Sequence, residues 1–222
     1  MTTFVMVPGG WHGGWNFDPL ASVLRARGHT VTALTLTGLR PDDDQATVAA
    51  TNLDTHVRDV VDALSADRLT DVTLVGHSYG GMVVAGVVDR VPRRIAKVVH
   101  VDAYVPGDGD SCWSLTTPAY RQLFLDGARQ TGYSVAPPPT LDPRTVPHPL
   151  ASFVQGLRLT NAPGEVPAVR HEFVYLTGWH GTPFTGTYER LREHPGWRTH
   201  TLGTGHNAMA EAPAELATLL TG

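Results

Sequence analysis

The fold is decided by the stretch Val72-Thr73-Leu74-Val75-Gly76-His77-Ser78-Tyr79-Gly80-Gly81. It joins an apolar run typical of a buried strand, through a G-x-S-x-G sequence, to residues 82–88, whose small apolar side chains are typical of a helix packed on a sheet. A serine at so sharp a strand-to-helix turn has a strained backbone, and its hydroxyl projects from the fold. A Cβ at Gly76 or Gly80 would collide across the turn. An ordinary glycine-rich turn is the alternative, but the strand–turn–helix context favours Ser78 as a nucleophile.

A histidine in the last part of the sequence is well placed to be the base. Residues 197–202 alternate polar and apolar side chains, as an outer strand does, and the turn Gly203-Thr204-Gly205 then leads to His206 and a final helix. The carboxyl ends of parallel strands meet at one edge of a sheet, so we expect His206 near Ser78. An imidazole within hydrogen-bond reach takes the serine proton during attack.

A glycine-rich loop follows the first predicted strand and reads Gly9-Gly10-Trp11-His12-Gly13-Gly14. Such a loop lets a backbone N–H approach a substrate oxygen closely, and fixed N–H donors stabilise negative charge that develops there. We expect the oxyanion hole to consist of the N–H groups of Gly10 and Tyr79. A dinucleotide site is the alternative. It is disfavoured because the spacing is not G-x-G-x-x-G and no acidic residue ends the second predicted strand.

Together these segments resemble the α/β-hydrolases, and in particular the small esterases and hydroxynitrile lyases, a group that includes plant methylesterases. The resemblance runs nearly from end to end. It rests on Gly9–Trp15, Gly28–Leu34, Gly76–Gly81 and Gly205–Met209. It implies the α/β-hydrolase fold, a Ser–His–acid site and no cofactor.

The sequence departs from this group at two places. The group usually has a histidine before the first glycine of the oxyanion loop, where this chain has Pro8. The acid usually follows the penultimate strand, but residues 177–183 contain no carboxylate.

Asp102 is the best substitute for the missing acid. It ends the apolar run 96–102, one strand after the nucleophile, and some lipases of this fold carry their acid there. Its role would be to hold the His206 imidazole in one tautomer and to stabilise the imidazolium. A strand-end aspartate that caps the following loop is the alternative. Glu172 lies at the start of its predicted strand, at the wrong end of the sheet.

The order of elements predicts one α/β domain over residues 1–222. We expect strands at residues 3–7, 30–36, 71–76, 95–101, 172–176 and 197–202, and helices at 16–27, 52–66, 79–91, 184–194 and 210–220. Alternating strands and helices predict a mostly parallel central sheet with helices on both faces. The interval 104–167 is too long for a plain loop, so we interpret it as a small helical cap over Ser78. Trp11, Trp113 and Phe153 are the candidate substrate-binding residues, because a cap must leave an apolar cavity.

Composition is consistent with an enzyme that acts on a small molecule. The net charge is −4 and the 17 basic residues are scattered, so we expect no nucleic-acid partner. No apolar run approaches the length of a membrane span, and the acidic triplet Asp42–Asp44 lacks the spacing of a calcium loop, so no membrane or metal is expected. A lone cysteine, Cys112, and a start that lacks signal-peptide features favour a cytoplasmic location. The sequence does not predict an oligomeric state.

Three functions remain open. The first is hydrolysis of a small, largely apolar ester or lactone through an acyl-enzyme. The second is lyase or carbon–carbon chemistry without acylation of Ser78. Lyases of the resembled group use a cap lysine, whereas the only lysine here is Lys97, outside the predicted cap. The third is a weakly active or non-enzymatic binding protein, because a fold alone does not establish activity. A burst of acyl product would distinguish the first function from the others.

Overall fold

Six parallel strands form one sheet in the computed structural model, which describes residues 1–166 and 168–222. Their spatial order is β2-β1-β3-β4-β7-β8. They are β1 (Thr3–Val7), β2 (Thr30–Ala33), β3 (Val72–His77), β4 (Ile95–Val101), β7 (Arg170–Leu176) and β8 (Trp197–Leu202). The strand order reverses between β1 and β3, and ligands of such sheets bind outside the carboxyl ends of the strands at this reversal.

The predicted fold class is confirmed, and all six predicted strands are present. Five of them agree with the prediction to within two residues at each end. Strand β2 ends at Ala33 rather than at residue 36, although the N–H of Leu34 still donates to the carbonyl of Met6 at 3.0 Å. The described sheet is parallel throughout.

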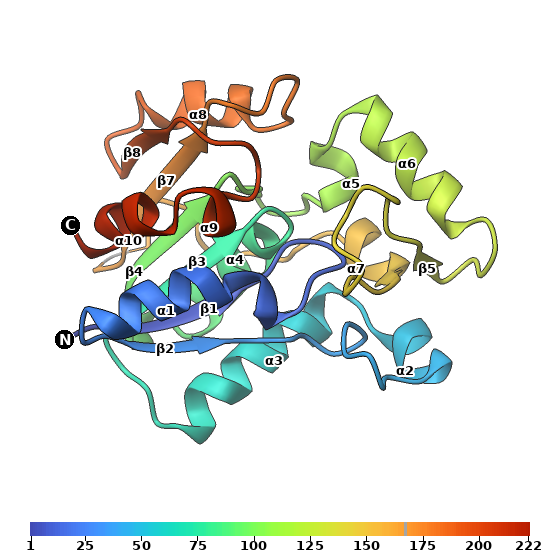
Figure 1. Cartoon of the computed structure of the whole chain (residues 1–222), viewed down its shortest axis with the longest axis horizontal. Helices are drawn as coiled ribbons and strands as arrows, with labels where there is room; N and C mark the ends of the chain where they lie inside the picture. The colour runs from blue at the N-terminus through green and yellow to red at the C-terminus, as the bar shows by residue number, and fades with distance from the viewer. Residues whose placement is uncertain (167) are drawn as a thin grey trace.

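Helices cover both faces of the sheet (Figure 1). Helices α1 (Asp18–Ala26), α9 (Ala208–Glu211) and α10 (Pro213–Thr221) pack on one face, over Phe4, Met6 and Val99. Helices α3 (Leu53–Ala66) and α4 (Gly80–Arg90) pack on the other, over Val5 and Leu74. Because α4 is apolar on all sides, residues 80–88 are buried between the sheet and its neighbours.

The ends of the helices follow from local chemistry. Asn52 caps α3 in a capping box with Thr55, as the predicted helix start requires. The single helix predicted at 210–220 is instead split into α9 and α10, because Pro213 has no N–H to donate. Short helices that were not predicted separately are η1 (Gly14–Phe17), α2 (Gln45–Ala50) and η2 (Pro92–Arg94), and α8 (Thr185–Leu191) is shorter than expected. Asp44 caps α2 by accepting from the N–H of Thr47 at 2.7 Å.

The segment between β4 and β7 lies beyond the carboxyl ends of β1 and β2 (Figure 1). We call residues 104–166 the cap region; residue 167, where we predicted its end, lies outside the described residues. It contains three short helices, as we predicted for this interval: α5 (Cys112–Leu115), α6 (Pro118–Ala128) and α7 (Leu150–Val154). It also contains an antiparallel pair that was not predicted, β5 (Ser134–Val135) and β6 (His148–Pro149).

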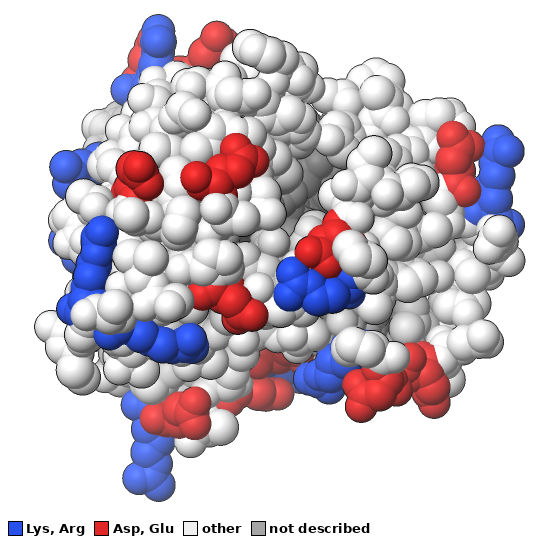
Figure 2. Space-filling model, in the orientation of Figure 1, with Lys and Arg blue, Asp and Glu red and all other residues white. Residues whose placement is uncertain are grey.

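Charges of both signs are scattered over the face shown in Figure 2, without a continuous basic patch. In the described part of the chain, no helix combines the length and the apolar character that a membrane crossing needs. The same residues contain no cluster of three or more His, Cys, Asp or Glu side chains arranged to hold a metal ion.

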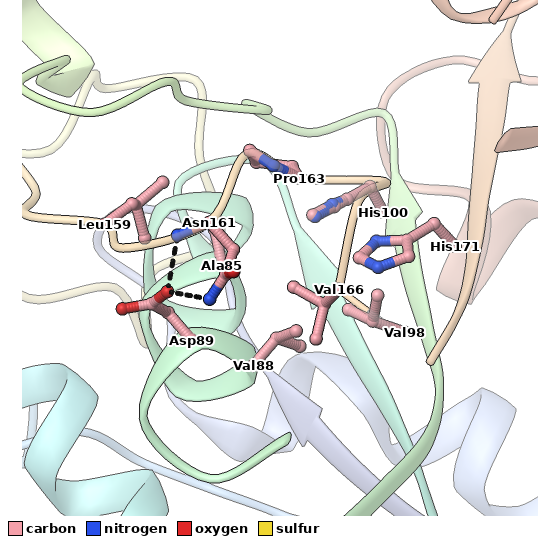
Figure 3. A pocket seen from close by; sticks show the side chains of 10 residues that line it. All are labelled: Ala85, Val88, Asp89, Val98, His100, Leu159, Asn161, Pro163, Val166 and His171. Carbon is pink, nitrogen blue, oxygen red and sulfur yellow. Dashed lines mark hydrogen bonds between the residues drawn. The ribbon is translucent and has the colours of Figure 1, made fainter. Parts of the chain in front are cut away.

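Two buried histidines lie beside a small cavity between α4 and the strands β4 and β7 (Figure 3). The cavity has a volume of about 10 Å³, and the rings of His100 and His171 line it. All four ring nitrogens are buried without a hydrogen-bond partner among the described residues. Because burial disfavours the charged imidazolium, it lowers the pKa of His100 to about 3 and that of His171 to about 4.

Because His100 and His171 are buried in the neutral form, we expect the free energy of unfolding to decrease in acid. An unfolded histidine has a pKa of about 6.5, so below this pH the unfolded chain binds protons that the folded chain does not. The stabilisation is fully present above about pH 6.5 and is lost as the pH falls toward the folded-state pKa values. Replacing His100 by Gln should reduce the slope of the unfolding free energy against pH by roughly 1.4 kcal/mol per pH unit between about pH 5.5 and 4.5. Urea denaturation across this range measures the slope.

The matched control is His180→Gln, because His180 is exposed. It should leave the slope unchanged. An unchanged slope in His100→Gln as well would contradict the account of buried neutral histidines.

Candidate active site

Ser78 lies at the turn between β3 and α4, with its backbone in the left-handed region at a φ of 53°. The glycines on either side permit this turn. A Cβ at Gly76 would lie 2.7 Å from the carbonyl oxygen of Gly80, and a Cβ at Gly80 would lie 2.5 Å from that of Val7. Both predicted collisions are therefore confirmed. The carbonyl of Ser78 also accepts a hydrogen bond from the N–H of Tyr104 at 3.2 Å, which holds the turn against the start of the cap region.

His206 and Asp102 form a short hydrogen bond at the same edge of the sheet. The Nδ1–H of His206 donates to Oδ2 of Asp102 at 2.7 Å. Asp102 follows β4, is fully buried and has a φ of 43°, while the N–H of Leu176 lies 3.5 Å from its other oxygen. The structure thus brings a carboxylate to His206 from the strand beside β3, without any contribution from residues 177–183.

Burial acts on both partners of this pair. It raises the pKa of Asp102 to about 7, although the Leu176 N–H acts in the opposite direction. It also lowers the pKa of His206 to about 3. Desolvation therefore keeps His206 neutral near pH 7, which is the form able to accept a proton. A carboxylate in contact with an imidazole favours the charged form of the ring, which is opposite to the effect of burial.

A second histidine supports the His206 loop. The Nε2–H of His77 donates to the carbonyl of His206 at 2.9 Å, and the two rings lie 4.4 Å apart. Trp179 contacts His206 from another side, with ring centroids 4.1 Å apart. Glu172 lies elsewhere: it is buried beside Lys97 and His200, at 3.6 and 3.3 Å.

The two expected oxyanion donors are free to bind a ligand. The N–H groups of Gly10 and Tyr79 have no hydrogen-bond partner in residues 1–166 and 168–222. The glycine-rich loop after β1 lies against Ser78, since a Cβ at Gly9 would lie 3.0 Å from the Cβ of Ser78. A Cβ at Gly10 would lie 3.2 Å from the ring of Phe153, so a larger residue here would require this ring to shift by a few tenths of an ångström.

A cavity of about 230 Å³ opens beside Ser78 and includes His206 in its wall. Its other lining residues, mostly apolar or aromatic, are Gly9, Gly10, Trp11, His12, His77, Tyr104, Tyr120, Leu123, Pro138, Thr140, Leu141, Trp179, Pro183 and Phe184. Most belong to the cap region and to loops that follow the strands. We did not predict Tyr104, Leu123, Leu141 or Phe184 as lining residues, because isolated apolar residues carry no sequence signal for a cavity.

A smaller cavity of about 30 Å³ also touches Ser78. It is lined by Gly10, Trp11, Tyr79, Tyr104, Cys112, Tyr120, Phe124 and Phe153. Of the three predicted pocket residues, Trp11 therefore borders both cavities and Phe153 borders the smaller one. Trp113 lines neither; it packs against the core from α5, with the guanidinium of Arg121 5.9 Å from its ring centre.

The model of the alpha/beta hydrolase family matches residues 4–219, and the chain belongs to this family. Sequence similarity extends over the whole molecule to a carbendazim-hydrolysing esterase of Nocardioides sp. (strain SG-4G), which is 35% identical over 98% of this chain and 97% of its own length. Salicylic acid-binding protein 2 of Nicotiana tabacum is 38% identical, but over only 46% of this chain and 40% of its own length.

One solved structure shows the same fold along its whole length. It is an extracellular α/β-hydrolase from a Paenibacillus species, described as sharing structural and functional homology with the tobacco protein. It superposes with a TM-score of 0.84 at 24% identity and covers 100% of this chain and 98% of its own. The resemblance inferred from the sequence motifs is confirmed at the level of family and fold.

Proposed function

We propose that this carboxylic ester hydrolase cleaves a small, largely apolar ester or lactone through an acyl-enzyme on Ser78. The observation that carries the proposal is the arrangement at one edge of the sheet. Ser78, in a strained turn, borders the same cavity as His206, and His206 is bound at 2.7 Å to the buried Asp102. Membership of the family and similarity to an esterase over nearly the whole chain support ester hydrolysis.

Each residue has a defined role in the proposed reaction. Nε2 of His206 accepts the proton of Ser78 as its oxygen attacks the ester carbonyl carbon. The negative oxygen that results accepts hydrogen bonds from the N–H groups of Gly10 and Tyr79. His206 then gives the proton to the departing alkoxide, and the acyl group stays on Ser78. Water, deprotonated by His206, releases the acid and restores the serine.

Two cavities border Ser78, and their different sizes suggest which part of the substrate each one binds. The larger, at about 230 Å³, is walled mainly by rings and aliphatic side chains, which suits a flat, apolar group. The smaller, at about 30 Å³, admits only a short substituent. We therefore propose esters with one bulky apolar part and one small part. Carbendazim belongs in the substrate panel because a relative that matches the whole chain is named for its hydrolysis.

Two alternatives are less well supported. A lyase with a cap lysine does not fit, because the sole lysine, Lys97, is buried and donates to the carbonyl of Leu220 at 2.8 Å. A non-enzymatic binding protein would not require the buried pair of Asp102 and His206, whose desolvation costs free energy of folding, and buried titratable pairs beside a cavity are typical of catalytic sites.

We expect p-nitrophenyl acetate to give a burst of nitrophenolate, because acylation of Ser78 precedes slower deacylation. The burst amplitude should equal the enzyme concentration in stopped-flow absorbance. Ser78→Ala should lose the burst and most of the turnover. A burst that persists undiminished in Ser78→Ala would refute the acyl-enzyme. Thr73→Ser, a change in the same strand away from the cavity, is the control and should behave as wild type.

Asp102→Asn should lower kcat by roughly 10³- to 10⁴-fold, because the amide favours the wrong tautomer of His206. The wild-type kcat/KM should also fall as the pH drops below about 7, since burial raises the pKa of Asp102 to about 7 and the pair loses its charge on protonation. This acid limb should be absent from the variant. The measurement is kcat/KM from pH 5 to 9, in steps of roughly half a unit, with circular dichroism as a folding control. If the decrease of kcat/KM in acid is unchanged in Asp102→Asn, the decrease must be due to another titratable group.

A further inference from the structure

The oxyanion loop contains one strained residue, Trp11, immediately after the donor Gly10. Its φ is 66°, in the left-handed region that a bulky side chain rarely adopts. Such a conformation persists only where surrounding contacts determine it. The two glycines before it, Gly9 and Gly10, have no conformational preference of their own. The direction of the Gly10 N–H therefore depends on contacts on both sides of Gly10: the carbonyl of Gly9, in the same peptide, accepts from the N–H of His12 at 3.3 Å, and the next peptide is held through Trp11.

The cap region binds every polar group of Trp11. The backbone N–H of Trp11 donates to Nδ1 of His148 at 3.1 Å, and its carbonyl accepts from the N–H of Val146 at 3.1 Å. The indole N–H donates to the carbonyl of Val135 at 2.8 Å. These partners lie in or beside β5 and β6, so the two-stranded sheet of the cap region clamps the oxyanion loop.

The hydrogen bonds of His148 define which of its ring nitrogens carries the proton. The N–H of Trp11 can only donate, so Nδ1 of His148 must be the unprotonated acceptor. Its Nε2–H donates to Oγ of Ser152 at 2.8 Å, and the Ser152 hydroxyl donates in turn to the carbonyl of Pro149 at 2.8 Å. This chain of donors determines the neutral tautomer of His148.

The ring of His148 also packs against both sides of the site. It is fully buried and stacks on Phe153, with centroids 4.1 Å apart and an interplanar angle of 8°. Phe153 in turn covers the open side of Gly10. The edge contact of His148 with Tyr79, at 4.7 Å, reaches the second oxyanion residue. The hydroxyl of Tyr79 is itself held by His56 at 2.8 Å.

We propose that His148 is a positioning residue for the oxyanion hole: by accepting the N–H of Trp11, it fixes the peptide after Gly10, limits rotation about Gly10 and so helps to keep the Gly10 N–H aimed at the substrate oxygen. The other end of this peptide is held as well, because Nδ1–H of His12 donates to the carbonyl of Gly10 at 2.7 Å. The inference rests on the proposed esterase function. It assigns to the cap region a role in transition-state stabilisation in addition to enclosing the substrate.

The test compares His148→Leu with His148→Asn. Leu fills the space but accepts no hydrogen bond, whereas Oδ1 of Asn can reach the position of Nδ1. His148→Leu should lower kcat by roughly 10- to 100-fold, the scale expected when a catalytic donor is misplaced, with KM changed by less than about threefold. Affinity for a trifluoromethyl ketone, whose adduct on Ser78 places an oxyanion in the hole, should fall by the same factor. His148→Asn should recover most of both losses.

His171→Leu is the matched control, since His171 is also buried but lines the distant cavity of Figure 3. It should keep kcat and ketone affinity. Ser152→Ala tests the hydrogen bond between His148 and Ser152 without changing the imidazole ring. It removes the acceptor of the His148 Nε2–H, so that the proton can move to Nδ1, which then no longer accepts from Trp11. We expect kcat to fall while the protein still folds. If His148→Leu does not fold, the comparison of Ser152→Ala with His148→Asn decides.

A His148→Leu enzyme with kcat and ketone affinity within about twofold of wild type would overturn the proposal, as the expected misplacement costs far more. So would equal losses in His148→Leu and His148→Asn that follow the melting temperature, because they would indicate a purely structural role. Full turnover by Ser78→Ala would instead refute the proposed function, so the two failures are distinguishable.

Discussion

The carboxylate of Asp102 is the constraint on which the site depends. A fully buried carboxyl group is costly to ionise unless it accepts hydrogen bonds. The short hydrogen bond to Asp102 comes from the imidazole of His206. That requirement brings the loop after β8 over the end of β4. The carbonyl of the same histidine is held by His77, next to Ser78, so Asp102, His206 and the turn at Ser78 form one connected unit. The reactivity that we propose for Ser78 follows from this connection.

The strand order makes this unit possible. Because the order reverses between β1 and β3, the loop after β1 lies beside the turn after β3, and Gly9 approaches Ser78 closely. The proposed acid, Asp102, then follows β4, the next strand along, and the proposed base, His206, follows β8. The ring of Trp179 packs beside His206 in the loop that follows β7.

Local patterns made much of this predictable. The apolar run 72–75 and the glycines around Ser78 specify a strand and a tight turn by short-range sterics, and parallel topology then brings strand-end residues such as Asp102 to one edge. The cap region was predictable only as an interval of short helices. Strands β5 and β6 have two residues each and leave no periodic signal. The contact of Trp11 with His148 joins residues 137 positions apart, and nothing local in either segment indicates it. Trp113 shows the same limit: an aromatic residue in a cap can line a cavity or pack on the core, and composition does not distinguish the two.

The central claim is that Ser78, His206 and Asp102 act together beneath an oxyanion hole formed by Gly10 and Tyr79. A crystal structure of the chain after reaction with an organophosphonate tests it most directly. The account predicts phosphorus bonded to Oγ of Ser78, one phosphonyl oxygen within hydrogen-bond distance of both N–H groups, roughly 2.7–3.1 Å, and the bond between His206 and Asp102 intact. An adduct on another residue, or a phosphonyl oxygen directed away from Gly10 and Tyr79, would contradict it.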